Sequence, residues 1–109
     1  MYEYWLKPPI YQVVDYQGDI APVQAWLDSL DKDLLREEYG ASNFRIVETR
    51  YGMEIQWDGL TWEYAGRHVL VPGKAIAWQP RPEPVEGTPV LFYLETYPFN
   101  RFEPAVTSQ

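Results

Sequence analysis

Residues 53–64 carry the strongest structural signal of the chain and read Met53-Glu54-Ile55-Gln56-Trp57-Asp58-Gly59-Leu60-Thr61-Trp62-Glu63-Tyr64. Polar and apolar residues alternate on both sides of Asp-Gly, a dipeptide typical of a two-residue hairpin with a type I′ turn. In that register apolar pairs face each other on one side of the hairpin: Trp57 with Leu60, Ile55 with Trp62, and Met53 with Tyr64. The stretch therefore predicts an antiparallel hairpin with one strongly apolar face.

The segment before the hairpin predicts a strand and then a helix. Residues 10–16 are rich in β-branched and aromatic residues and follow a Pro-Pro pair, which favours a strand. Asp19 and Pro22 are typical of the first turn of a helix. Apolar residues then recur at helical spacing, namely Val23, Trp26, Leu27 and Leu30.

A second short helix is expected over residues 32–39. The apolar stripe of the first helix is interrupted and then resumes out of phase. Ser29 or Asp31 is a candidate N-cap, and Gly40 is expected to end the helix. A single kinked helix is the alternative, and we favour two separate helices.

The remaining chain predicts short strands joined by turns, over residues 43–51, 68–71, 75–79 and 90–95. Alternating prolines indicate an extended surface loop at 80–87, and residues 99–104 predict a last turn. We expect one domain over residues 1–109 with a loose tail at 105–109. Its predicted class is α+β: a curved, mostly antiparallel sheet or small open barrel of about six strands, packed against one or two N-terminal helices.

The composition excludes several classes of protein. The 109 residues include sixteen acidic and nine basic side chains, for a formal net charge of -7, and no cysteine. Without cysteine there is no disulfide, thiolate metal site or cysteine nucleophile. The acidic balance argues against direct nucleic-acid binding, because that needs a basic face. The longest apolar run, residues 90–94, is far shorter than the roughly 20 residues that span a bilayer, so we expect no membrane association.

The residue pattern does not indicate catalysis, a metal site or a cofactor. His68 is the single histidine, and we interpret it as a surface or strand-end residue rather than a general base. Asp28, Asp31 and Asp33 form the densest acidic cluster, which helix capping and solvation explain better than cation binding. The chain also has no glycine-rich phosphate loop. We therefore expect a protein that is not an enzyme.

Aromatic residues are in surplus. Tyr, Trp and Phe make up 17% of the chain, more than one small core can hide. Four of them are natural core members: Trp26, Trp57, Trp62 and Phe92. Seven others are candidates for partial exposure and partner binding: Tyr2, Tyr4, Trp5, Tyr51, Trp78, Tyr93 and Tyr97. Edge packing under loops explains such residues equally well.

Several short motifs are spread over most of the chain. The first half has Lys7-Pro8-Pro9-Ile10, residues 13–18 and Val23-Gln24-Ala25-Trp26-Leu27. The second half has Gly66-Arg67-His68-Val69-Leu70-Val71, Pro72-Gly73-Lys74 and Phe99 with Arg101-Phe102-Glu103-Pro104. In this order they resemble small uncharacterised bacteriophage proteins, which carry a Lys-Pro strand, a Gly-Asp-Trp-Ile-Val-like strand and a C-terminal Phe-Glu-Pro ending. The resemblance implies a phage or prophage origin, and it implies more about fold than about chemistry.

Together these observations predict a non-enzymatic phage accessory protein that binds a host or phage protein in the host cytoplasm. Whether it forms a homodimer stays open. One alternative is an anti-defence inhibitor, either an acidic decoy for a nucleic-acid channel or a sequesterer of small nucleotides with an aromatic pocket. The other alternative is a structural component of the virion.

Overall fold

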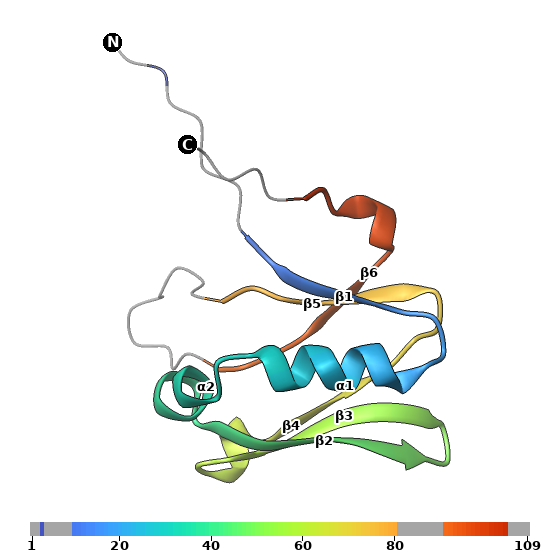
Figure 1. Cartoon of the computed structure of the whole chain (residues 1–109). Helices are drawn as coiled ribbons and strands as arrows, with labels where there is room; N and C mark the ends of the chain where they lie inside the picture. Colours follow the sequence, from blue (N-terminus) through green and yellow to red (C-terminus); the bar gives the residue numbers. More distant parts are fainter. Residues whose placement is uncertain (1–2, 4–9, 81–90, 105–109) are drawn as a thin grey trace.

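The computed structural model describes Glu3 and residues 10–80 and 91–104, which form two helices and two three-stranded antiparallel sheets (Figure 1). Sheet A has the strand order β1 (Gln12–Tyr16), β5 (Lys74–Trp78) and β6 (Glu95–Tyr97). Sheet B has the strand order β2 (Ala41–Thr49), β3 (Gly52–Gly59) and β4 (Gly66–Val69). The predicted α+β class with open, antiparallel sheets is confirmed. Residues 81–87 of the expected loop and the tail at 105–109 lie outside the described residues.

Two separate helices follow β1, as predicted: α1 (Ile20–Ser29) and α2 (Lys32–Tyr39). The carboxylate of Asp19 accepts a hydrogen bond from the Ala21 N–H at 3.0 Å and so caps α1. Asp31 caps α2 by accepting from the Leu34 N–H at 3.1 Å. Gly40 ends α2 with a φ of 63°, a conformation that glycine adopts at little cost.

Helix α1 lies between the two sheets (Figure 1) and packs against β1 and β2. Its predicted apolar stripe is in the core, where Val23, Leu27 and Leu30 are buried and Trp26 is partly buried beside them. Helix α2 packs against β2 and contributes the buried side chains of Leu35 and Tyr39. The two helices therefore cover the side of the core that lies between β1 and β2.

Strand β3 does not turn back at Asp58-Gly59, so the predicted hairpin register is wrong. The ladder partners of β3 lie further along the chain in β4, where Gly66 pairs with Trp57. The connection contains a short 3-10 helix, η1 (Trp62–Tyr64). The two apolar residues expected to face Trp57 and Ile55 are exposed to solvent, Leu60 at 83% and Trp62 at 84%.

Gly59 explains this difference. A type I′ turn needs positive φ at both central residues, whereas neither Asp58 nor Gly59 has a positive φ. Glycine is needed here for space instead, because an added Cβ would lie 2.2 Å from the backbone nitrogen of Ala65. The connection therefore folds directly against the Gly59 backbone, and the ladder begins again at Gly66.

The tight hairpin of sheet B lies at Arg50-Tyr51, between β2 and β3. Thr49 pairs with Gly52, and the Thr49 hydroxyl accepts a hydrogen bond from the Tyr51 N–H at 3.2 Å. The same hydroxyl donates to the Gly52 carbonyl at 2.8 Å. Gly52 has a φ of 124°, so the unusual conformation of this turn falls on a glycine.

The other strands differ from their predicted boundaries. Strand β2 covers 41–49 instead of 43–51, β4 covers 66–69 instead of 68–71, and β5 covers 74–78 instead of 75–79. Strand β6 covers 95–97 instead of 90–95, because residues 91–94 lie outside the ladder. Burial still alternates along that segment and places Phe92 and Leu94 in the core.

Phe92 lies where the two sheets and α2 meet. Four aromatic rings surround it at the following centroid distances: Trp57 at 4.9 Å, Phe44 at 5.1 Å, Trp78 at 5.5 Å and Tyr39 at 6.5 Å. Most of these contacts have the edge-to-face geometry that aromatic pairs prefer. Because Trp57 belongs to sheet B and Trp78 to sheet A, Phe92 joins the two sheets into one core.

A polar contact joins the sheets at a second point. His68 in β4 and Thr96 in β6 form a side-chain hydrogen bond of 2.7 Å between Nε2 and Oγ1. Both strands are edge strands of their sheets, so this bond lies at the seam between them. His68 is half-buried near the end of β4, so of the two expected positions it takes the strand end rather than the open surface.

Candidate functional site

Three of the seven predicted partner contacts lie outside the described residues: Tyr2, Tyr4 and Trp5. Tyr51 is 85% exposed at the tip of the β2–β3 hairpin. Tyr93 is 49% exposed, and Tyr97 is partly exposed. The expected exposure of these three tyrosines is confirmed, and exposure alone does not test the partner contact that the sequence led us to expect.

Trp78 is only 3% exposed, so its predicted partial exposure is wrong. Its ring faces the core, 5.8 Å from the ring of Tyr39 and 5.5 Å from that of Phe92. The opposite face of β5 is covered as well, because Ala75 and Ala77 are fully buried. Strand β5 is the central strand of sheet A, and both of its faces are buried. Its sequence does not reveal this.

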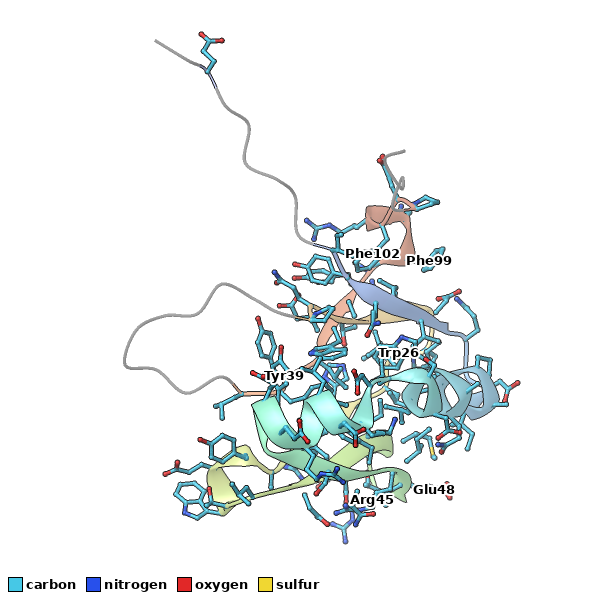
Figure 2. All side chains as sticks on the ribbon, turned by 60° about the vertical axis from the view of Figure 1, so that its left-hand side comes forward. Trp26, Tyr39, Arg45, Glu48, Phe99 and Phe102 are labelled. Atoms are coloured by element: carbon cyan, nitrogen blue, oxygen red, sulfur yellow. The ribbon has the colours of Figure 1, made fainter. Side chains whose placement is uncertain are left out.

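A group of partly exposed side chains lies on the outer face of sheet A, and we call it the tyrosine face: Tyr11, Tyr93, Glu95, Tyr97 and Phe102. Tyr97 pairs with Ala75 and Glu95 pairs with Ala77, whose small side chains leave room above β5. Phe102 packs edge-on against this face, 5.9 Å from the ring of Tyr11 and 5.7 Å from that of Tyr97. Figure 2 shows Phe102 beside β1, whereas Phe99 is 51% exposed.

The tyrosine face is centred on a carboxylate. The Tyr97 hydroxyl donates a hydrogen bond of 2.6 Å to Glu95 Oε2, and this bond raises the pKa of Tyr97. Burial and the neighbouring Glu95 charge raise the pKa of Tyr93. The guanidinium of Arg101 lies 5.4 Å from the centroid of the Tyr97 ring. The face thus combines aromatic rings, a carboxylate and a stacked cation.

A second candidate surface is the segment 60–64, which we call the η1 turn. Its alternating sequence pattern predicts a place in the apolar face of a hairpin instead. Its two large apolar side chains, Leu60 and Trp62, are more than four-fifths exposed. The Leu60 N–H donates to the Gly40 carbonyl at 2.7 Å, and Trp57 Nε1 donates to the Tyr64 carbonyl at 3.2 Å. Hydrogen bonds at both ends therefore hold the backbone that carries the exposed side chains.

A shallow depression begins where the η1 turn ends, on the outer face of sheet B, and its lining residues are Arg45, Gln56, Trp57, Asp58, Ala65, Gly66 and Arg67. Arg45 forms an ion pair of 3.1 Å with Asp58. Hydrogen bonds from Asn43 and Arg45 lower the pKa of Asp58 and favour its charged form. Arg67 is exposed at the other side of the depression. The η1 turn therefore has polar and charged groups beside it.

The acidic cluster has the structural explanation that the sequence predicts. Asp31 caps α2, Asp33 forms an ion pair of 2.9 Å with Arg36, and Asp28 accepts from Gln24 at 3.0 Å. Within residues 10–80 and 91–104 we find no group of three or more His, Asp or Glu side chains placed to hold a metal ion.

The comparisons with known proteins add no assignment. No helix in the described part of the chain is long and apolar enough to cross a membrane. The chain matches no protein-family model, no curated protein and no solved structure.

Proposed function

We propose that this chain is a non-enzymatic binding protein that contacts a host or phage protein through the η1 turn. The observation that carries the proposal is the exposure of Leu60 at 83% and of Trp62 at 84%. Covering apolar surface yields about 25 cal/mol per Å², so both side chains gain free energy when a partner buries them. Tryptophan is also enriched among the few residues that dominate binding energy at interfaces.

The fixed backbone of the η1 turn supports the same function. Binding is weakened by the entropy cost of ordering a mobile loop, whereas a turn that is already held in place avoids most of this cost. Hydrogen bonds to Gly40 and from Trp57 hold the turn, and it packs directly against Gly59. The neighbouring depression places polar and charged groups beside the η1 turn, and protein interfaces likewise combine apolar contacts with polar groups at their rim.

The test compares partner capture by the wild-type chain with capture by a Leu60→Ala/Trp62→Ala double variant. We expect the double variant to lose affinity by about tenfold or more, because truncated hot-spot residues cost upwards of ~2 kcal/mol. The matched control is Tyr51→Ala, since Tyr51 is 85% exposed but lies at the opposite end of β3. Capture that is equal for the double variant and the wild type contradicts the proposal, as does recovery of the chain alone.

Other results of the same capture experiment would favour the alternative functions. Partner binding that weakens steeply with salt indicates an acidic decoy, because salt screens charge pairing. A nucleotide released on denaturation indicates a sequesterer, and ring-shaped assemblies indicate a virion component. Phage origin and a location in the host cytoplasm stay predictions, which the neighbouring genes would test.

A further inference from the structure

Glu95 forms no ion pair with another residue in the described part of the chain. The two ion pairs of that part of the chain lie elsewhere, between Arg36 and Asp33 and between Arg45 and Asp58. The Glu95 carboxylate accepts a hydrogen bond of 2.6 Å from the Tyr97 hydroxyl. The tyrosine face therefore has at its centre a carboxylate without an ion-pair partner among the described residues.

The Tyr97 ring already accepts a guanidinium from the same chain. Arg101 lies 5.4 Å from the ring centroid, within the range of about 6 Å for a cation–π contact. It belongs to the three-residue 3-10 helix η2 (Phe99–Arg101), and its side chain is exposed. An exposed contact of this kind is weak, so a cation from outside the chain can displace it.

The rings around this position are held in place before any ligand arrives. Phe102 packs edge-on against both Tyr11 and Tyr97. The Phe102 N–H donates to the Phe99 carbonyl at 3.1 Å, which fixes the turn behind the ring. A partner side chain therefore meets a formed aromatic surface with a carboxylate at its edge.

From this juxtaposition we propose that the tyrosine face binds an arginine side chain of a partner polypeptide, with its guanidinium on the Tyr97 ring and against the Glu95 carboxylate. The bound side chain replaces Arg101 on the ring. Arginine suits the site better than lysine, because its planar guanidinium stacks on an aromatic ring and donates to a carboxylate at the same time. The net charge of -7 favours approach of such a basic segment.

The experiment titrates the full-length chain with a five-residue glycine peptide that carries one central arginine, followed through the ring protons of Tyr97 and Phe102 by NMR. Matched peptides carry lysine or citrulline, which has the shape of arginine without its charge. We expect the arginine peptide to bind more tightly than both. If the arginine and citrulline peptides bind equally, the proposal is overturned. If the lysine peptide binds as tightly as the arginine peptide, the preference for arginine is overturned. If millimolar arginine peptide shifts neither set of ring protons, the whole proposal is overturned.

Variants identify the atoms involved. Arg101→Gln removes the internal cation, and we expect the arginine peptide to bind about two- to fivefold more tightly. Arg36→Gln is the matched control, because it removes the same charge from α2 and leaves the ring contact intact. Glu95→Gln keeps an acceptor for the Tyr97 hydroxyl but removes the carboxylate, so it should weaken binding of the arginine peptide. If Arg101→Gln and Arg36→Gln bind the peptide equally, Arg101 does not occupy the site.

This inference stands apart from the function proposed for the η1 turn. The Leu60→Ala/Trp62→Ala variant should bind the arginine peptide as the wild type does. Loss of peptide binding in that variant would show that the peptide does not report on the tyrosine face, and would contradict the inference. Failure of partner capture through the η1 turn leaves the peptide result unchanged.

Discussion

His68 and Thr96 join the edge strands of the two sheets through a hydrogen bond of 2.7 Å. Burial lowers the pKa of His68 below its ordinary value of 6.5, because the charged imidazolium would lose hydration in the fold. The unfolded chain titrates near the ordinary value. Between the two pKa values the unfolded chain therefore binds more protons than the folded chain, and the free energy of unfolding rises with pH.

We expect the stabilising contribution of neutral His68 to be complete above about pH 6.5 and to be lost as the pH falls towards the lower pKa of the folded state. His68→Gln should remove this slope. Thr96→Val should keep it, because burial and not the threonine hydroxyl lowers the pKa. Urea unfolding over about pH 5 to 8 measures the profiles, and an equally steep profile for His68→Gln contradicts this account.

At the scale of elements, local signals predict α1 and α2 correctly. Their apolar spacing, the caps at Asp19 and Asp31 and the stop at Gly40 all act within a few residues. The β3–β4 pairing depends instead on contacts between distant residues. Gly59 fits both a type I′ turn and a close backbone approach, and the packing of residues 61–65 against it selects the second.

The candidate surfaces are predictable only in part, because they too depend on contacts between residues that are distant in the sequence. The exposure of Tyr93 and Tyr97 follows from the surplus of aromatic residues, but their position around Glu95 depends on the register of β6 and on Phe102. The sequence pattern predicts a core position for Trp62, because the Asp58-Gly59 hairpin register pairs it with Ile55. The surface at the η1 turn therefore becomes visible only with the tertiary structure.

The substitution Gly59→Asn tests whether Gly59 serves a type I′ turn or the close approach of the residue 61–65 backbone. Asparagine is well tolerated in type I′ turns, whereas in this structure its Cβ would lie 2.2 Å from the Ala65 nitrogen. We expect the substitution to destabilise the fold by about 1–3 kcal/mol or more, as overpacking does. Chemical denaturation measures the change, and a loss below about 0.5 kcal/mol would favour the hairpin register instead.

The exposed residues of the η1 turn give a second test of the same element. Trp62→Ser should change the free energy of unfolding by only about 0.5 kcal/mol, because the side chain is 84% exposed. Trp57→Ser serves as the comparison, since Trp57 is 5% exposed and its loss should cost about 3–5 kcal/mol. Equal losses for the two variants would place Trp62 in the core and contradict the observed register.

At the scale of the whole molecule, two sheets share one core because Phe92 contacts rings from both. Phe92→Ala should destabilise the chain by about 3–5 kcal/mol through the cavity that it leaves. That is a large part of the roughly 5–15 kcal/mol that stabilises a typical domain. Phe99→Ala is the matched control, because Phe99 is 51% exposed and its loss should cost little. Thermal unfolding of the two variants measures the difference, and similar midpoints would contradict the central position of Phe92.

The proposed binding function implies a direction from which a partner approaches the molecule. Leu60 and Trp62 lie at one end of β3, and Tyr51 lies at the other. A photoreactive benzoylphenylalanine introduced in place of Trp62, and separately in place of Tyr51, reports directly which end a partner touches. We expect a covalent adduct with a partner protein from position 62 and none from position 51. An adduct from position 51 with none from position 62 would contradict it.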